Sequence, residues 1–186
     1  MTRRKEGTVA EPVGSRSGPP IVPMRWWHLT EVMVAERELF GAESWSAEAY
    51  WAELAQPETR HYVVALDPPT PPAAAPPTAA PYTAGPPAAP ARLAGYAGLA
   101  VFADEAHVLT LGVRRDRQRQ GVGTALLLDL LAEAARRRAR TVLLDVRADN
   151  PTAQRLYARH GFVPAGIRHR YYQPSGMDAV VMVRHG

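Results

Sequence analysis

A short run of glycine, glutamine and arginine gives the first indication of chemistry in this chain. Residues 118–124 read Gln-Arg-Gln-Gly-Val-Gly-Thr; they follow an apolar, strand-like segment at His107–Val113 and precede a long amphipathic stretch. A strand, a glycine-bearing turn and a helix start bring free backbone N–H groups and the positive end of a helix dipole to one place. The run therefore predicts a seat for a phosphate or pyrophosphate group, which Gly121 and Gly123 allow to approach closely.

Two familiar phosphate-binding loops do not match this run. The chain has no G-x-x-x-x-G-K-[ST] motif, and its only lysine is Lys5. Leu126 stands where the dinucleotide fingerprint G-x-G-x-x-G needs its third glycine. Arg119 and Arg117 add positive charge beside the glycines. The alternative interpretation is an ordinary glycine-rich helix start with solvated arginines.

The composition limits the class of protein. A chain of 186 residues, 46% of them hydrophobic, is expected to form one compact domain. No apolar run approaches the ~20 residues of a membrane span, and the first residues lack the apolar stretch of a signal peptide, so we expect a cytoplasmic protein. The chain has no cysteine, which excludes disulfides, thiolate metal sites and a cysteine nucleophile. The histidines show no metal-binding spacing, and no G-x-S-x-G marks a serine hydrolase.

The charge gives no strong indication of a nucleic-acid partner. The net charge is +4, and the arginines at 136–138 and 140 cluster where a helix is expected to end, which the helix dipole favours. No aromatic residues interleave with these arginines, so we expect no direct nucleic-acid binding. We expect a monomer or a weak dimer.

Two segments read as disordered, and the rest alternates between strand and helix patterns. Residues 1–23 are polar and rich in Gly, Pro and Ser, and Asp67–Ala91 holds 10 of the chain's 18 prolines. They leave a domain at 24–186 that the second segment interrupts. The predicted strands are Met24–Leu29, 61–66, 93–102, 107–113, Thr141–Val146, 162–167 and 178–184. Helices are predicted after the N-caps Thr30, Ser46 and Asn150, and at about 122–138. These elements predict an α/β architecture, a mixed sheet with helices on both faces.

With these motifs in place, the sequence resembles the GNAT superfamily of acetyl-CoA-dependent N-acetyltransferases, from about Met24 to Arg184 without the proline-rich insertion. It is most similar to the RimI-type enzymes, which acetylate the N-terminal alanine of a small-subunit ribosomal protein. The stretches that carry the resemblance are Asp104–Ala106, Thr110–Val113, Gln118–Gly123, Asp145–Asn150, Ala153–Tyr157, Gly161-Phe162, Arg168–Tyr172 and Asp178–Met182. The resemblance implies the GNAT fold, with a central, mostly antiparallel mixed sheet and helices on both faces. It also implies acetyl-CoA as co-substrate, with no metal.

The resemblance further implies where acetyl-CoA binds. The pyrophosphate is expected on the backbone amides of Gln118, Arg119, Gln120, Gly121, Val122, Gly123 and Thr124. The pantetheine arm is expected along the strand edge formed by Leu111, Gly112 and Val113, where the N–H of Val113 is the candidate donor to the thioester carbonyl. Asn150 is expected to contact the cofactor as well, with a helix N-cap as its alternative or additional role.

Two residues are implied as catalytic. Tyr157 matches the family's general-acid tyrosine, which protonates or hydrogen-bonds the departing thiolate; its alternative is a core aromatic. Asp145 stands where RimI-type enzymes generally have a glutamate base. Because aspartate is shorter by one methylene, about 1.5 Å, a bridging water or another group such as Glu105 could complete the proton path. The structural alternative for Asp145 is an ion pair with an arginine.

The substrate side is less specific. Trp45, Glu105, Tyr171 and Tyr172 are candidates for the substrate cleft, and packing is an equal alternative for each. Without a cysteine, the acetyl group is expected to pass directly to the amine within a ternary complex. The expected function is acetylation of a protein N-terminus, with the alanine of a ribosomal protein as the expected substrate. A lysine-directed or small-amine acetyltransferase and a non-catalytic acyl-CoA sensor are the alternatives, the last because Asp145 departs from glutamate.

Overall fold

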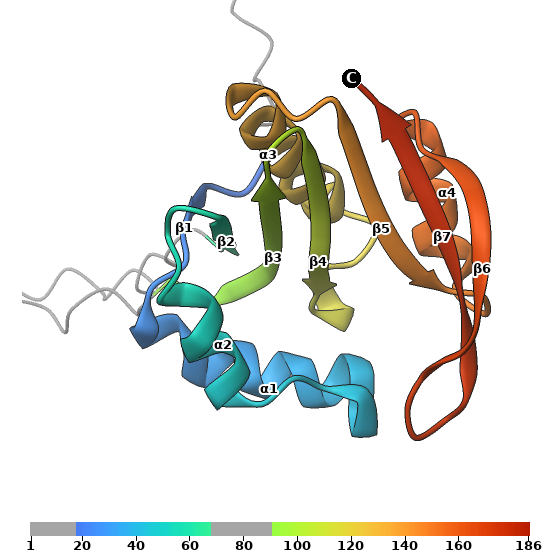
Figure 1. Ribbon diagram of the computed structural model, residues 1–186. Coiled ribbons are helices and arrows are strands. Elements are labelled where there is room, and N and C mark those ends of the chain that lie inside the picture. The colour runs from blue at the N-terminus through green and yellow to red at the C-terminus, as the bar shows by residue number, and fades with distance from the viewer. Residues whose placement is uncertain (1–17, 68–90) are drawn as a thin grey trace, which may run out of the picture.

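The computed structural model describes residues 18–67 and 91–186 (Figure 1). The strands are β1 Ile21–Pro23, β2 Arg60–Leu66, β3 Leu93–Phe102, β4 Glu105–Val113, β5 Thr141–Arg147, β6 Val163–Tyr172 and β7 Met177–His185. The helices are α1 Leu29–Phe40, α2 Ala47–Leu54, α3 Val122–Arg136 and α4 Pro151–Arg159. The predictions of disorder for residues 1–17 and 68–90 lie outside the described residues.

The strands form a single mixed sheet. Its seven strands follow the order β1-β2-β3-β4-β5-β7-β6. Every neighbouring pair is antiparallel except β4 and β5, which run parallel. The predicted mixed, mostly antiparallel sheet is therefore confirmed. The N–H of Asp67 donates to the carbonyl oxygen of Arg92 at 2.8 Å, so the two ends of the β2–β3 connection lie side by side.

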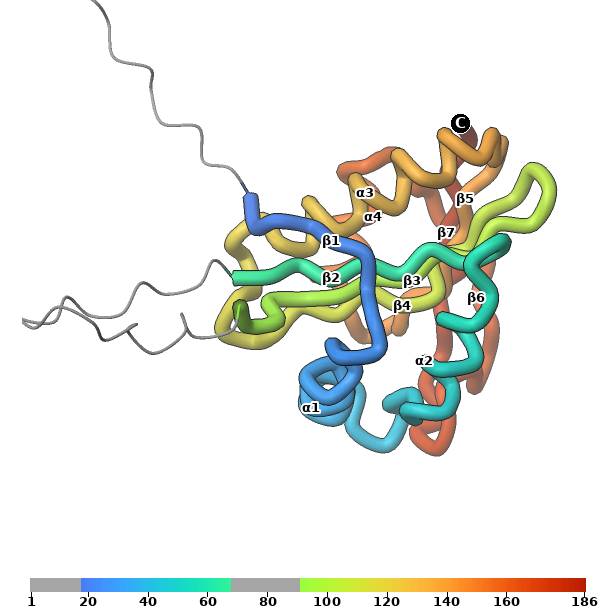
Figure 2. The backbone as a smooth tube through the Cα atoms, turned by 90° about the vertical axis from the view of Figure 1, so that its left-hand side faces the viewer, coloured from blue at the N-terminus to red at the C-terminus, as the bar shows by residue number. Residues whose placement is uncertain are grey.

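Helices cover both faces of the sheet, as predicted. α3 and α4 lie on one face and α1 and α2 on the other (Figure 2). Leu126, Leu127 and Leu130 bring the apolar side of α3 into the first of two cores. The second core lies under α1 and α2 and contains Val32 and Tyr50. Because one sheet separates two apolar layers, strand residues that alternate in direction contribute to both cores.

Two predicted helix caps are present. The Ser46 hydroxyl oxygen accepts a hydrogen bond from the N–H of Ala49 at 3.2 Å, at the start of α2. The side-chain oxygen of Asn150 accepts from the N–H of Ala153 at 3.0 Å, at the start of α4. Both caps satisfy N–H groups that the first helical turn leaves free.

The predicted first strand at Met24–Leu29 is wrong. Residues 26–28 form a single 3-10 turn and α1 begins at Leu29, so Thr30 lies inside the helix and is not its N-cap. The first strand is β1, at positions assigned to the disordered tail, and it pairs with β2. Met24 and Leu29, at the ends of this apolar run, are buried, but the side chains of Trp26 and Trp27 between them are 62% and 59% exposed and do not enter the core.

Other predicted ends shift by a few residues. α3 ends at Arg136, because Arg138 has a φ of 63° that a helix cannot contain. β6 continues to Tyr172, five residues past its predicted end. Among the described residues, no helix has the length and apolar character needed to cross a membrane.

Candidate active site

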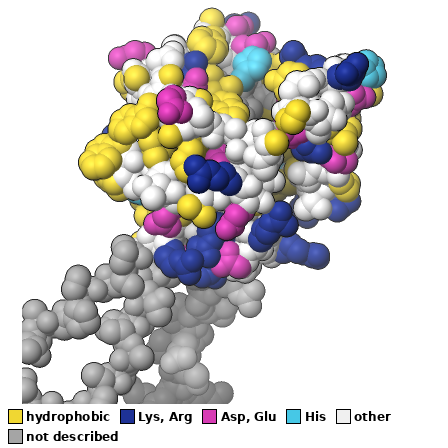
Figure 3. Space-filling view, turned by 90° about the horizontal axis from the view of Figure 1, so that it is seen from below, with side chains coloured by type: hydrophobic (Ala, Val, Ile, Leu, Met, Phe, Trp, Pro, Cys, Tyr) yellow, Lys and Arg dark blue, Asp and Glu magenta, His cyan; other side chains and the backbone are white. Residues whose placement is uncertain are grey.

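A cleft opens where β4 and β5 separate. The parallel pairing runs from Glu105 opposite Thr141 to Val108 opposite Leu144 and stops there. At that point the β3–β4 register shifts and leaves Leu109 as an extra residue on β4, a β-bulge that bends the strand. The diverging strands border a pocket of about 140 Å³. In the space-filling view, a hollow separates the main body of the molecule from a smaller lobe on the side of β6 and β7 (Figure 3).

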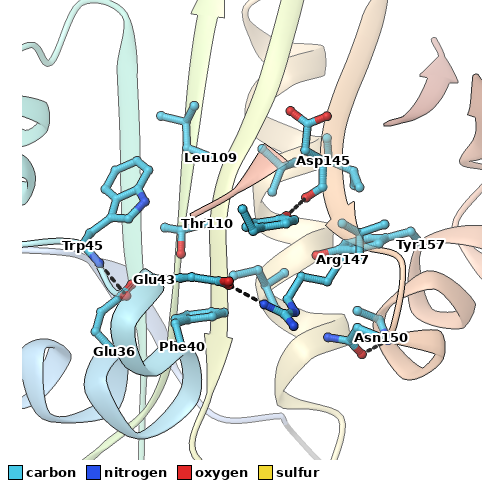
Figure 4. A pocket seen from close by; sticks show the side chains of 16 residues that line it. Glu36, Phe40, Glu43, Trp45, Leu109, Thr110, Asp145, Arg147, Asn150 and Tyr157 are labelled. Carbon is cyan, nitrogen blue, oxygen red and sulfur yellow. Dashed lines mark hydrogen bonds and ion pairs between the residues drawn. The ribbon is translucent and has the colours of Figure 1, made fainter. Parts of the chain in front are cut away.

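Residues from both halves of the sheet face one another across this cleft (Figure 4). One wall comes from α1, the loop after it and the bulged part of β4, and the other comes from β5 and α4. The residues on the first wall are Glu36, Phe40, Glu43, Trp45, Leu109 and Thr110, and those on the second are Asp145, Arg147, Asn150 and Tyr157.

The edge of β4 beyond the bulge offers backbone donors to the cleft. The N–H of Arg114 donates to the carbonyl oxygen of Ala94 on β3 at 3.0 Å. Because hydrogen-bonded pairs alternate along an antiparallel ladder, the N–H groups of Leu111 and Val113 turn away from β3 and toward β5. The side-chain amide of Gln118 donates to the carbonyl oxygen of Val113 at 3.1 Å, on that same edge.

The start of α3 lies next to this edge and has no side-chain cap. Gly121 occupies the N-cap with a φ of 85°, a conformation that glycine adopts without a steric penalty. A Cβ at Gly121 would meet no atom within 4 Å, so the space in front of the helix is open. At Gly123 a Cβ would lie 3.5 Å from Leu156 and from Val113, which is ordinary contact. The first N–H groups of this 15-residue helix have no side-chain cap, and such groups are able to bind an anion.

Asp145 is held by an arginine. Its Oδ1 lies 3.1 Å from Nε of Arg168 on β6. The pair meets the distance of an ion pair but not the angle of a hydrogen bond, and this buried Oδ1 has no hydrogen-bond partner among the described residues. The backbone oxygen of Asp145 accepts from the Tyr172 hydroxyl at 3.2 Å. Burial first, and then the negative Asp145, raises the pKa of Tyr171.

Tyr157 is both a core residue and a cleft residue. It is 7% exposed and packs edge-on against Phe162, with 5.8 Å between the ring centres. It also lines the pocket from α4. Burial raises the pKa of its hydroxyl to about 12. The hydroxyl therefore keeps its proton throughout the neutral range, as a proton donor must.

Arg147 links the two walls of the cleft. Its guanidinium contacts Glu43 at 2.5 Å and Asp149 at 2.9 Å, and its Cζ lies 5.6 Å from the ring centre of Tyr172. The Ser175 hydroxyl, in the β6–β7 connection, donates to the other oxygen of Glu43. These contacts join the loop after α1 to β5 and to the β6–β7 hairpin, and they place a positive charge beside Glu43.

Glu36 is a buried carboxylate on the first wall. It is 1% exposed, its Oε1 accepts from the Tyr50 hydroxyl at 2.5 Å, and its Oε2 accepts from the backbone N–H of Trp45 at 3.1 Å. Sequence reasoning missed Glu36, Glu43 and Arg147. The spacing of Leu29, Val32 and Glu36 carries a signal for Glu36, because it places a carboxylate on the apolar face of a helix.

The four candidates for substrate binding lie in different parts of the structure. Trp45 and Tyr172 line the cleft, whereas Tyr171 is 46% exposed and is absent from the pocket lining. Glu105 lies at the opposite end of β4, 2.5 Å from Nε2 of His107. It pairs with Thr141, four residues before Asp145 on β5, a separation of about 13 Å along the strand. The structure therefore does not bring Glu105 together with the other candidates.

Within residues 18–67 and 91–186, no group of three or more His, Asp or Glu side chains is placed to hold a metal ion. The cleft has the composition of a site for an anionic ligand and an amine. It combines backbone donors on an open strand edge, carboxylates and a protonated tyrosine, and the uncapped start of α3 lies beside that edge, next to Leu111 and Val113.

A model of the acetyltransferase (GNAT) family matches residues 25–162. The N-alpha-acetyltransferase RimI of Mycobacterium tuberculosis is 36% identical over 154 residues, which cover 80% of this chain and 81% of that protein. The [ribosomal protein bS18]-alanine N-acetyltransferase of Escherichia coli K12 is 41% identical over 93 residues, 49% of this chain. A putative enzyme of the same description from Bacillus subtilis is 34% identical over 90 residues, 48% of this chain. The matches to the last two span 63% and 60% of those relatives' length.

Solved structures share the fold. The crystal structure of the ribosomal-protein-S18-alanine N-acetyltransferase from Escherichia coli has a TM-score of 0.67 and 28% identity, covering 89% of this chain and 92% of that one. Arabidopsis thaliana NAA60, solved with a bisubstrate analogue, has a TM-score of 0.70 at 20% identity, over 89% of this chain and 97% of that one.

Proposed function

Because the chain belongs to the GNAT family of acetyltransferases, we propose that it transfers an acetyl group from acetyl-CoA to the N-terminal α-amine of a protein. The substrate we propose is the N-terminal alanine of a small-subunit ribosomal protein, in line with the names of its relatives from Escherichia coli and Bacillus subtilis. One observation carries the proposal. The open edge of β4 and a carboxylate–tyrosine pair border one cleft, and the uncapped start of α3 lies against that edge, with Gly123 beside Leu111 and Val113.

The residues at the start of α3 fit the anionic part of acetyl-CoA. The backbone amides from Gln118 to Thr124 are proposed to hold the pyrophosphate, since the helix start is uncapped and Gly121 leaves the space before it open. The pantetheine arm is proposed to lie along Leu111–Val113, whose outward N–H and C=O groups match the carbonyl oxygens and N–H groups of its amides. Asn150 borders the same pocket and is proposed as a further contact beside its role as N-cap.

Proton transfer is assigned to two residues on the second wall. An α-amine has a pKa of about 8, so a weak base suffices to free it near neutral pH. Asp145 is proposed to accept that proton, directly or through a water. The amine then attacks the thioester carbon, and the N–H of Val113 stabilises the oxygen that becomes negative. As the C–S bond breaks, Tyr157 donates its proton to the thiolate, and the second proton that the nitrogen loses on becoming an amide restores the Tyr157 hydroxyl. The chain has no cysteine to carry the acetyl group, which supports direct transfer.

The substrate chain is proposed to enter between the loop after α1 and the β6–β7 hairpin. Trp45 and Tyr172 line this entrance, and Tyr171 lies exposed beside it. Glu105 lies about 13 Å along the sheet from Asp145, so the proposal gives it no contact with the amine.

The test is acetyl transfer to short peptides. One set begins with free Ala, Ser, Gly or Met; the other has blocked N-termini and one lysine. We expect transfer to free N-termini, and a loss of about 100-fold or more in kcat for Tyr157→Phe and for Asp145→Ala. Asp129→Asn is the control, because Asp129 lies on α3 and pairs with His61 on β2, away from the cleft. Transfer to lysine alone would contradict the proposed substrate class.

The ion pair between Asp145 and Arg168 favours a second candidate function, an acyl-CoA-binding sensor in which the carboxylate is structural. Asp145→Glu distinguishes the two. A catalyst is expected to keep or gain transfer activity with the longer carboxylate, whereas a sensor binds acetyl-CoA and stays inert with every peptide.

A further inference from the structure

Three carboxylates line the first and second walls of the cleft, and they differ in what balances their charge. Glu43 contacts the guanidinium of Arg147 at 2.5 Å, and Asp145 lies 3.1 Å from that of Arg168. Glu36 has no Lys, Arg or His nitrogen within 4 Å among the described residues. It is also the most deeply buried of the three, at 1% exposed.

The groups around Glu36 are neutral hydrogen-bond donors. The Tyr50 hydroxyl and the backbone N–H of Trp45 each bind one carboxylate oxygen, at 2.5 and 3.1 Å. The Tyr96 hydroxyl is buried nearby and has no hydrogen-bond partner among the described residues. Burial, and then the charge of Glu36, raises the pKa of Tyr96. Burial, then Tyr96 and then Glu36 raise that of Tyr50. Both phenols therefore stay protonated beside it.

A buried carboxylate without a cation is costly, because neutral donors replace only part of its hydration. Glu36 nevertheless reaches the pocket, beside Thr110 and across from Asp145 (Figure 4). Its partners hold its two oxygens in place but leave its negative charge unbalanced. A cation that entered the cleft would complete the site.

We propose that Glu36 binds the positively charged α-ammonium group of the substrate. The inference rests on the proposed function and names the residue that recognises its substrate. Glu36 attracts the charged amine and orients it with N–H···O hydrogen bonds. After one proton leaves toward Asp145, the neutral amine still has two N–H donors for Glu36, and its lone pair is free for attack.

Equilibrium binding to the CoA-loaded protein tests this assignment without turnover. The probes are a short peptide with a free N-terminal alanine, its N-acetylated form, and a form with a hydroxyl in place of the amine. The wild-type protein is expected to bind the free-amine peptide about tenfold or more tightly than the two uncharged forms. Glu36→Gln is expected to remove that preference. Glu38→Gln, on the exposed side of the same helix, is the matched control and is expected to keep it.

The outcomes separate this inference from the proposed function. A wild-type preference that Glu36→Gln retains would overturn the role of Glu36 and leave the function intact. Alaninamide, which carries the same free α-amine, is a further probe. If the wild-type protein binds neither the free-amine peptide nor alaninamide, the proposed substrate class and the inference both fail. Folding of the variants is checked by circular dichroism. If Glu36→Gln does not fold, Glu36→Asp, which keeps the charge, and the hydroxyl peptide on the wild-type protein decide, and equal affinity for amine and hydroxyl overturns the inference.

Discussion

Gly112 allows β4, the strand proposed to bind acetyl-CoA, to pack against the side chain of Tyr96. A Cβ at this position would lie 2.5 Å from the ring and 2.6 Å from the hydroxyl oxygen of the buried Tyr96. Gly112→Ala is therefore expected to lower the free energy of unfolding by about 1–3 kcal/mol, through overpacking. Urea denaturation measures the change.

Gly123→Ala is the control for this prediction. Its added Cβ would lie 3.5 Å from its nearest neighbours, within ordinary contact. Because alanine favours a helix over glycine, the variant is expected to keep the wild-type stability or to gain up to about 1 kcal/mol. Equal losses at both positions would show that crowding at Tyr96 is not the cause.

The sequence motifs located residues of the cleft correctly, whereas the burial of a polar residue was not predicted. Asp145, Asn150 and Tyr157 were singled out from motifs and all line the cleft, while their roles stay predictions. Glu36 was missed, although its spacing from Leu29 and Val32 places it on the apolar face of a helix. Glu105 was a candidate for the substrate cleft, but it begins β4, and a strand carries its first residues far from its last.

At the scale of one element, the N-cap of α4 joins stability to the site. Asn150→Ala removes the acceptor for the N–H of Ala153 and is expected to cost about 1 kcal/mol of unfolding free energy. Asn150→Ser restores a cap oxygen and is expected to recover most of that loss. If Asn150 also contacts acetyl-CoA, the serine variant binds it more weakly than the wild type despite normal stability, as calorimetry can measure.

The opposite result would limit Asn150 to its structural role. Acetyl-CoA affinity that follows unfolding stability in both variants contradicts a direct contact. The control is Ser46→Ala, which removes the cap of α2, so that it lowers stability without touching the proposed cofactor seat.

The start of α4 was predicted correctly, because an N-cap residue and a proline indicate the same boundary at Asn150-Pro151. The start of α1 was predicted wrongly. The apolar run Met24–Leu29 was interpreted as a strand, whereas Trp26 and Trp27 within it are exposed. The bulge at Leu109, where β4 and β5 separate, could not be predicted from the sequence, because it depends on the register of β4 against β3.

Across the whole molecule, the cleft follows from a sheet that is continuous at one end and split at the other. β4 and β5 pair over four residues, and each then continues beside its own antiparallel neighbours. The alternation of strands and helices predicted the mixed sheet. It could not predict that β7 lies between β5 and β6, because that order arises from pairing between residues distant in sequence.

The two cores on either side of that sheet make the fold sensitive to alkali. Burial is the largest cause that raises the pKa of five tyrosines, at positions 50, 62, 96, 157 and 172, and for Tyr157 the value is about 12. In the unfolded chain they ionise near pH 10, whereas the folded protein keeps them protonated. Their contribution to stability is therefore complete below pH 10 and is lost as the pH rises above it.

Each tyrosine that ionises only on unfolding lowers the free energy of unfolding by about 1.4 kcal/mol per pH unit above pH 10. Urea midpoints are expected to be flat from pH 8 to 9.5 and to fall steeply by pH 11. Tyr157→Phe removes one such group, so its slope above pH 10 should be shallower by about 1.4 kcal/mol per pH unit. A free energy of unfolding that stays level to pH 11.5 would mean that these hydroxyls ionise as easily in the folded protein as in water, and that neither core excludes solvent.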